Sequence, residues 1–107
     1  MTNRPTSLTV ACPAFNEETA IERVVRDVLA KLPRLVDDFE LLVVDDGSTD
    51  RTPEILAGLA AELPRLRVIT HPRNLGFAGF ARSLIANASK EAYVGISADG
   101  EIDLDVI

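Results

Sequence analysis

Two adjacent carboxylates, Asp45 and Asp46, directly follow an apolar run at residues 41–44. A strand that is buried on both faces shows such a run, and ligands of open α/β sheets bind just beyond the carboxyl ends of the strands. Neighbouring carboxylates resist desolvation, so N–H groups of a turn, a cation or the N–H edge of a base must offset their charge. Since Gly47 and Ser48 follow, an Asx-turn with a helix cap is the alternative interpretation. We expect one carboxylate to be structural and the other to face a ligand.

Two further segments place polar groups at the ends of expected strands. Residues 13–17 offer the ring of Phe15, the amide of Asn16 and the carboxylate of Glu17, although helix capping explains this composition equally well. Asp99 follows the last expected strand. A carboxylate there can hold Mg²⁺ or Mn²⁺ together with waters and substrate phosphates, and an Asp-Gly turn is the alternative.

The glycine-bearing segment at residues 71–79 resembles phosphate-binding loops only superficially. Its Gly76 and Gly79 do not complete the G-x-G-x-x-G pattern, which excludes a dinucleotide fingerprint. Arg82 could contact a diphosphate, with a plain surface arginine as the alternative. His71, the single histidine, has no nucleophile at a recognisable spacing and is interpreted as a loop residue. Cys12 lies in an apolar strand and is expected to be inert.

The hydrophobic pattern predicts the elements that position these residues. The expected strands are 8–12, 39–44, 66–70 and 93–97, and the expected helices are 16–32, 52–63 and 80–89. This alternation predicts an α/β fold with three layers (αβα) around a mostly parallel sheet of about four strands. Asn16 or Thr19 is expected to cap the first helix. Ser48, Thr49 or Thr52 is expected to cap the second.

Composition limits the class of protein. The chain has 107 residues, of which 47% are apolar and 26% charged, as in an ordinary single domain. No apolar run approaches the roughly 20 residues of a membrane helix, and the first residues lack the apolar core of a secretory signal. A net charge of −6 without a basic cluster argues against a nucleic-acid partner. The single cysteine suits a reducing, cytoplasmic location, with membrane contact only if a longer chain carries helices.

Four segments together resemble one family. Residues 10–18 are similar to a "P-A-Y-N-E-E" strand end, and residues 43–50 to a "V-V-D-D-G-S-x-D" signature. Residues 74–79 with Arg82 are similar to an "N-x-G" loop followed by a basic residue, and residues 98–100 fall where "D-A-D-G" is found. In this order and spacing they resemble the amino-terminal half of an inverting family-2 glycosyltransferase of the GT-A fold.

The resemblance implies a site for a nucleotide-diphospho-sugar donor, linked to UDP or GDP. Pro13, Phe15 and Glu17 would flank the base and ribose, and one of Asp45 and Asp46 would accept a hydrogen bond from the base or ribose. The full set that the resemblance assigns to the donor nucleotide is Pro13, Ala14, Phe15, Asn16, Glu17, Asp45, Asp46, Gly47, Ser48, Asn74, Gly76 and Arg82.

The resemblance also implies a divalent cation, Mg²⁺ or Mn²⁺, on the diphosphate. Asp99 would help to hold it, so that the cation stabilises charge on the leaving nucleoside diphosphate. The first carboxylate of the family's D-x-D pattern is Ser97 here. A hydroxyl is a weak neutral ligand, so the affinity for the metal should be lower.

The family's general base and acceptor-binding elements lie in a carboxyl-terminal half that these residues do not include. We therefore expect residues 1–107 to form a single donor half-domain, without the acceptor half, that binds donor and transfers no sugar. The uncovered sheet edge at residues 93–97 invites pairing with another chain. The alternative is therefore a non-catalytic nucleotide-binding or oligomerisation module with a decayed metal site. A phosphoacceptor receiver domain is disfavoured, because Cys12-Pro13 and Thr70-His71 occupy the positions of its acidic residues.

Overall fold

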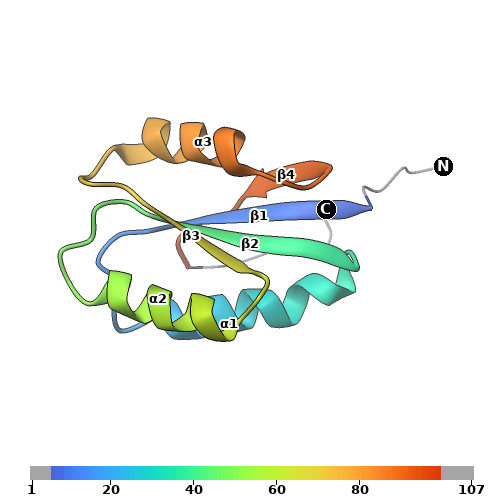
Figure 1. Ribbon diagram of the computed structural model, residues 1–107, viewed down its shortest axis with the longest axis horizontal. Helices are drawn as coiled ribbons and strands as arrows, with labels where there is room; N and C mark the ends of the chain where they lie inside the picture. The colour runs from blue at the N-terminus through green and yellow to red at the C-terminus, as the bar shows by residue number, and fades with distance from the viewer. Residues whose placement is uncertain (1–5, 100–107) are drawn as a thin grey trace.

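The computed structural model describes residues 6–99 and alternates strands with helices throughout (Figure 1). The elements are β1 (Ser7–Ala14), α1 (Ile21–Lys31), the short 3-10 helix η1 (Leu32–Arg34), β2 (Asp38–Asp45), α2 (Thr52–Glu62), β3 (Leu66–Thr70), α3 (Gly76–Asn87) and β4 (Ala92–Gly95). The predicted order of strands and helices is confirmed.

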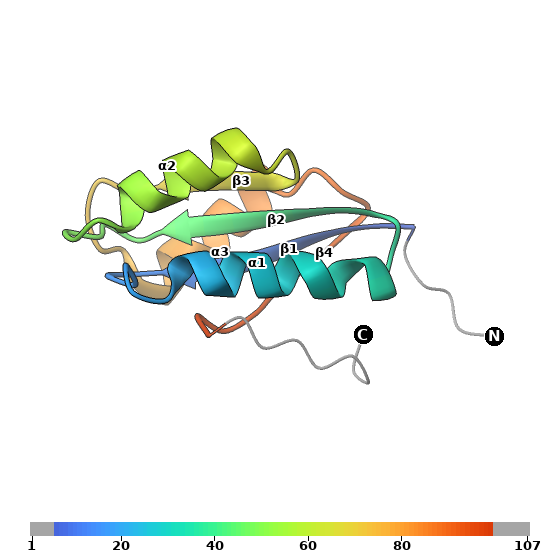
Figure 2. The same cartoon turned by 90° about the horizontal axis from the view of Figure 1, so that it is seen from below.

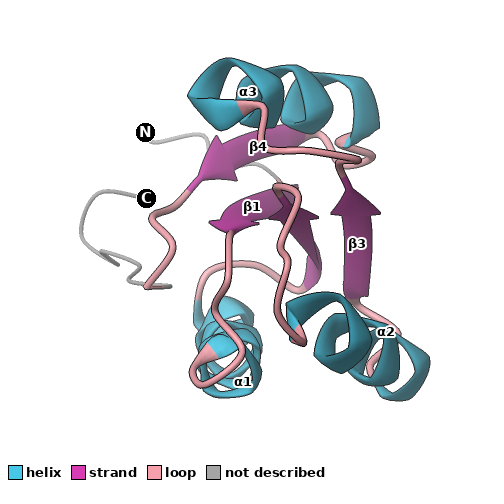
Figure 3. Ribbon diagram, turned by 90° about the vertical axis from the view of Figure 1, so that its left-hand side faces the viewer, coloured by secondary structure: helices cyan, strands magenta, loops and turns pink. Residues whose placement is uncertain are grey.

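The four strands form one parallel sheet in the order β3-β2-β1-β4. Helices α1 and α2 cover one face of the sheet and α3 covers the other (Figure 3). This arrangement confirms the predicted three-layer α/β fold. Because all strands run in the same direction, the turns that follow β1, β2 and β3 gather at one end of the sheet (Figure 2).

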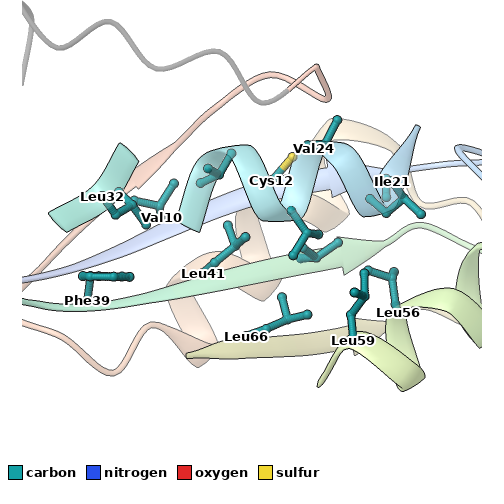
Figure 4. Packing of buried hydrophobic residues seen from close by; sticks show 14 of the residues in the cluster. Val10, Cys12, Ile21, Val24, Leu32, Phe39, Leu41, Leu56, Leu59 and Leu66 are labelled. Carbon is teal, nitrogen blue, oxygen red and sulfur yellow. The ribbon is translucent and has the colours of Figure 1, made fainter. Parts of the chain in front are cut away.

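The central strands β1 and β2 are buried on both faces, which explains their continuous apolar sequences. Alternate residues such as Val10, Cys12, Phe39 and Leu41 pack against α1 and α2 in the larger part of the core (Figure 4). The intervening residues Ala11, Leu42 and Val44 pack against Phe80 and Leu84 of α3. The sheet is thus held from both sides and forms a rigid base for its strand ends.

Strand β1 continues through Pro13 to Ala14, beyond the expected end at Cys12. In a parallel sheet, the backbone N–H and C=O groups of successive residues point alternately to the two neighbouring strands. The C=O group of Ala11 points to the β4 side and accepts a hydrogen bond from the N–H of Ile96. Pro13 therefore also faces the β4 side, where β4 has already ended at Gly95. The N–H that proline lacks has no strand partner at this position, so the strand tolerates it.

The expected helix caps are wrong. Ala20 and Arg51 occupy the N-cap positions of α1 and α2, and neither makes a side-chain cap hydrogen bond. Asn16 and Thr52 bond across to the neighbouring loop instead, as described below. Helix α3 begins at Gly76, four residues before the expected start, and β4 spans Ala92–Gly95, which is shorter than expected.

Two exposed features of the described chain bear on partners. Strand β4 is one edge of the sheet, and its Tyr93 is exposed. Pairing of this edge with a second copy stays a prediction. None of the helices within residues 6–99 has both the length and the apolar character required to cross a membrane.

A buried polar network ties the amino-terminal end of the sheet to the segment after α3. The Glu40 Oε2 atom accepts hydrogen bonds from Thr9 Oγ1 at 2.6 Å and from Ser89 N at 3.0 Å and Oγ at 2.7 Å. Its Oε1 atom accepts from Arg67 Nη1 at 2.9 Å. Burial by itself would raise the pKa of Glu40, but these hydrogen bonds outweigh it and lower the pKa to about 2.

Replacing Glu40 with glutamine should lower the free energy of unfolding at pH 7 by about 1–3 kcal/mol, because the amide loses the charge-assisted bond and presents N–H groups to donors. The folded pKa of about 2 lies below the unfolded value, so the carboxylate stabilises the fold fully above pH ~5 and loses this effect as the pH falls toward 2. Urea unfolding from pH 7 to pH 3 should show wild type and variant converging. The exposed Glu54→Gln control should change little. A difference that is constant across this range would contradict the assignment.

Candidate functional site

A cleft of about 680 Å³ opens at the carboxyl ends of the strands, a volume typical of small-molecule sites. Its walls come from the end of β1, the loop after β2, the first turns of α3 and the segment after β4. The lining is mostly apolar, with a few polar groups. The lining residues are Pro13, Ala14, Phe15, Glu17, Asp46, Asn74, Gly76, Phe77, Phe80, Ala81, Leu84, Gly95, Ile96, Ser97 and Ala98.

The structure brings together part of the predicted site. The predicted residues that line the cleft are Pro13, Ala14, Phe15, Glu17, Asp46, Asn74 and Gly76. Asn16, Gly47 and Ser48 lie outside this lining, in the loops after β1 and β2, and Asp45 is the last residue of β2. Arg82 is exposed on α3 outside the lining, and Asp99 lies two residues beyond Ser97.

Sequence reasoning missed the apolar wall that α3 contributes. Phe77, Ala81 and Leu84 repeat at a helical spacing and line the cleft. This signal was present in the sequence, but the expected helix began only at Phe80. The two glycines at 76 and 79 favoured a loop, which hid the first turn of the helix.

Asp46 is the polar group that the protein holds most tightly at the cleft. Its Oδ1 accepts from Leu75 N at 2.7 Å and lies 2.8 Å from His71 Nδ1, while its Oδ2 accepts from Gly76 N at 2.9 Å. Burial alone would raise the pKa of Asp46, but the hydrogen bonds from these groups lower it. Asp46 is therefore an oriented, ionised carboxylate that is 8% exposed at the cleft.

Asp45 lies in a different environment from its neighbour. It has no exposed surface, its Oδ1 accepts from Ser48 N at 3.2 Å, and its Oδ2 is buried without a hydrogen-bond partner. The alternation of β2 places Asp45 with Leu41 and Val43 on the face that α1 and α2 cover. Of the two adjacent carboxylates, Asp46 is the one that lines the cleft.

His71 lies in the loop that follows β3, as expected, but its side chain is buried and has two partners that the sequence did not indicate. The imidazole is only 6% exposed, with Nδ1 2.8 Å from Asp46 Oδ1 and Nε2 2.7 Å from Ser83 Oγ. Ser83 is twelve residues away in sequence, within α3. Only the packing of α3 on the sheet brings these side chains together, so no local pattern could have indicated the contact.

Asn16 joins the loops that follow β1 and β2. Its backbone is left-handed, with φ of 52°, and its N–H donates to Ser48 Oγ at 2.9 Å. Its side-chain Oδ1 accepts from Thr49 N at 2.8 Å and Asp50 N at 3.3 Å. Asparagine tolerates this backbone conformation better than most residues. Asn16 therefore holds the loop in place rather than facing the cleft.

The same two loops are joined at two further points. Glu17 N donates to Thr52 Oγ1 at 2.9 Å, and Glu18 N donates to Asp50 Oδ2 at 3.2 Å. Asp50 Oδ1 in turn accepts from Thr52 N at 2.8 Å. The loop that carries Phe15 and Glu17 to the rim of the cleft is therefore fixed on the start of α2.

Replacing Asn16 with alanine should lower the free energy of unfolding by about 2–3 kcal/mol, since it removes the side-chain acceptor and strains a left-handed residue. Glycine at this position also lacks the side-chain acceptor, but it adopts the left-handed backbone conformation without strain. Asn16→Gly should therefore lower the free energy of unfolding by about 1 kcal/mol less than Asn16→Ala. Urea unfolding of the two variants measures the difference. Equal destabilisation would show that the backbone conformation contributes nothing.

Ser97 and Asp99 are the candidate metal ligands. The Ser97 hydroxyl donates to Asp99 Oδ1, and Ser97 lines the cleft. Within residues 6–99 there is no group of three or more histidine, cysteine, aspartate or glutamate side chains arranged for a metal. Mg²⁺ and Mn²⁺ on a diphosphate commonly use one or two protein ligands, with phosphates and waters completing the shell. The oxygen donors of Asp99 and Ser97 fit such a shared site.

Cys12 lies beneath this segment, with Sγ 3.4 Å from the carbonyl oxygen of Ser97. Burial, reinforced by the negative charges of Asp99 and Glu17, raises the pKa of the thiol to about 12. The thiol stays protonated at neutral pH and is neither a nucleophile nor a metal ligand. This agrees with the expectation that Cys12 is inert.

The parallel sheet, with a cleft at its strand ends and an ionised carboxylate beside the start of α3, defines a Rossmann-like α/β ligand-binding fold. Residues 9–107 match the family model described as glycosyl transferase family 2. The chain belongs to this family.

Solved relatives share the fold. The chain is 32% identical to the mannosyltransferase PcManGT of Pyrobaculum calidifontis, solved in complex with GDP-Man and Mn²⁺, with a TM-score of 0.76 over 92% of this chain. It is 29% identical to TarS of S. aureus, solved in complex with UDP, with a TM-score of 0.71 over 87% of this chain. These neighbours confirm the GT-A type of Rossmann-like sheet.

Among curated relatives, a dolichyl-phosphate beta-glucosyltransferase of Trichomonas vaginalis is 29% identical over 102 residues, which is 91% of this chain. The match covers 30% of that glucosyltransferase, 28% of the mannosyltransferase and 27% of the TarS chain. The chain thus spans less than a third of the length of these relatives.

Proposed function

We propose that the cleft binds the nucleoside diphosphate of a sugar donor, and that residues 1–107 form the donor half-domain of a glycosyltransferase. The observation that carries this proposal is Asp46, an ionised carboxylate held in one orientation at a mostly apolar cleft. The solved relatives with GDP-Man and UDP support it.

The nucleoside would lie against the β1 end of the cleft. The Asp46 Oδ2 atom accepts one hydrogen bond from the protein, from Gly76, and can accept a further one. Uracil and guanine both carry a ring N–H that could donate to it. Phe15, which is 44% exposed, would pack its ring on the base, and Glu17 would accept from ribose hydroxyls. These contacts suit both UDP and GDP.

The diphosphate would extend toward Ser97 and Asp99, where Mg²⁺ or Mn²⁺ would be shared between protein and phosphates. When bound, the cation stabilises negative charge on the departing nucleoside diphosphate. Because Ser97 contributes a neutral oxygen, we expect weaker metal affinity than two carboxylates would give. Asn74 and Gly76 would border the phosphates, whereas Arg82 lies outside the cleft lining.

We propose the donor-binding step alone for these residues. The motifs that resemble the family account for base, ribose, diphosphate and metal, and they include no general base for the acceptor hydroxyl. The acceptor and the transferred sugar are therefore not assigned. We further propose a cytoplasmic location, on the basis of the single cysteine.

Isothermal titration calorimetry with UDP and GDP, with and without Mn²⁺, tests the proposal. CDP and ADP are matched controls, because the corresponding ring nitrogen carries no hydrogen. We expect UDP or GDP to bind at least about tenfold more tightly than its control. Mn²⁺ should increase the affinity of wild type more than that of Asp99→Asn. The absence of heat with both UDP and GDP, or equal affinity for all four nucleotides, would contradict the proposal.

A non-catalytic module is the second candidate. Ser97 in place of a carboxylate and the exposed Tyr93 on the β4 edge favour it. Light scattering coupled to size exclusion distinguishes the two functions. A tight dimer without nucleotide affinity would favour the module, and a monomer that binds UDP or GDP would favour the donor site.

A further inference from the structure

A chain of three side chains runs from the cleft into the α3 layer. Asp46 lines the cleft, His71 lies behind it, and Ser83 of α3 lies behind His71. The two contacts are 2.8 Å between Asp46 Oδ1 and His71 Nδ1, and 2.7 Å between His71 Nε2 and Ser83 Oγ. His71 and Ser83 are absent from the cleft lining.

The same three residue types form the nucleophilic triad of hydrolases, but the order relative to the ligand is reversed here. In such a triad the serine faces the substrate and the carboxylate lies farthest from it. Here the carboxylate faces the cleft, and Ser83 lies farthest from it. The arrangement cannot deliver a serine nucleophile to a ligand in the cleft, so it must act on Asp46.

The position of the ring protons follows from the carboxylate. Hydrogen bonds keep the pKa of Asp46 low, and an ionised carboxylate only accepts hydrogen bonds. The His71 Nδ1 atom therefore carries the hydrogen that bonds Asp46. The Nε2 atom lies 2.7 Å from Ser83 Oγ, and the direction of this hydrogen bond follows the protonation of the ring. Both ring nitrogens are satisfied, and a flipped ring would lose both bonds.

We infer that His71 is a positioning residue of the nucleotide site, which orients the Asp46 carboxylate from behind and couples it to α3. This inference rests on the proposed function of the cleft. The backbone N–H groups of Leu75 and Gly76 contact the carboxylate from the start of α3, and His71 contacts it from the end of β3. Donors from two elements determine the plane of the carboxylate, so its remaining acceptor capacity is preorganised for the base.

Two substitutions separate the two contacts of His71. In His71→Asn the amide nitrogen lies near the position of Nδ1, so the bond to Asp46 is kept and the bond to Ser83 is lost. In His71→Gln the amide reaches toward Ser83 and the bond to Asp46 is lost. Each variant removes one buried hydrogen bond, so their losses of stability in urea should be similar. A role limited to structure therefore predicts similar nucleotide affinities as well.

Titration calorimetry with UDP and GDP should instead separate the two variants. We expect His71→Gln to bind about tenfold more weakly than wild type, and His71→Asn and Ser83→Ala to stay within about threefold. Equal losses in His71→Asn and His71→Gln, or wild-type affinity in His71→Gln, would overturn the inference.

A second readout needs no nucleotide. The ¹³Cγ chemical shift of Asp46, followed against pH, should show a pKa that rises in His71→Gln and stays low in His71→Asn. Equal Asp46 pKa values in the two variants would overturn the inference. If wild type binds neither UDP nor GDP while this titration separates the variants, the proposed function fails and the positioning of Asp46 by His71 stands.

Discussion

Replacing Gly47 with alanine should lower the free energy of unfolding by about 2–5 kcal/mol and abolish nucleotide binding. Gly47 has a φ of 74°, and a Cβ there would lie 2.4 Å from the carbonyl carbon of Arg73 and 2.6 Å from Asn74 N. Both are backbone atoms, so no flexible side chain can move aside. The segment cannot retreat freely, because the N–H groups of Leu75 and Gly76 bind Asp46.

Two other glycines serve as controls for this prediction. Gly76 has a φ of 71° with nothing within 4 Å of a Cβ, so Gly76→Ala should cost only the backbone strain, about 1–2 kcal/mol. Gly58 lies within α2 with the same open space, and Gly58→Ala should stabilise by about 0.5–1 kcal/mol. Urea unfolding of the three variants measures their changes in the free energy of unfolding, and we expect the largest loss for Gly47→Ala. A cost at Gly47 no larger than that at Gly76 would show that the close approach of the two loops is unimportant.

Replacing Asp46 with asparagine should lower the free energy of unfolding by about 2–4 kcal/mol at pH 7 and weaken UDP or GDP binding by at least about tenfold. Three donors, from His71, Leu75 and Gly76, converge on the carboxylate. An amide offers one acceptor oxygen, so its NH₂ group must face at least one of these donors.

The effect of Asp46 on stability should depend on pH in a defined direction. Its folded pKa is lowered, so its contribution is complete above the unfolded value near 3.9 and is lost as the pH falls through the folded pKa. The free energies of unfolding of wild type and Asp46→Asn, measured in urea, should therefore differ most at neutral pH, and the difference should shrink as the pH falls below the unfolded value. The exposed Asp27→Asn on α1 is the control and should change little. An Asp46→Asn variant as stable as wild type at pH 7 would contradict the assigned hydrogen bonds.

The sheet could be predicted from the sequence because its central strands are buried on both faces. Runs such as residues 41–44 are too short for a helix and too apolar for a surface strand, so they indicate buried strands. The start of α3 could not be predicted in this way. Gly76 and Gly79 favour a loop locally, whereas the first turn is held by the bonds from Leu75 and Gly76 to Asp46, which lies 29 and 30 residues away.

In the candidate site, too, part could be predicted from the sequence and part depends on long-range contacts. Its location followed from the rule that ligands bind at strand ends, and Asp46, Phe15 and Glu17 do line the cleft. The contacts that orient these residues are long-range. Asn16 has the composition of a local helix cap, yet it bonds Thr49 and Asp50 in the next loop, 33 and 34 residues away. A single sequence contains no signal that separates these two uses of an asparagine.

The central claim is that a nucleoside diphosphate occupies the cleft at the carboxyl ends of the strands. Amide chemical-shift mapping by NMR during titration with UDP or GDP tests it most directly. We predict that the largest changes occur at Phe15, Asp46, Gly76 and Ser97, and that the amides of Glu40 and Ser89 at the opposite end of the sheet stay unchanged. Changes centred on Glu40 and Ser89, or no changes with either nucleotide, would contradict the claim.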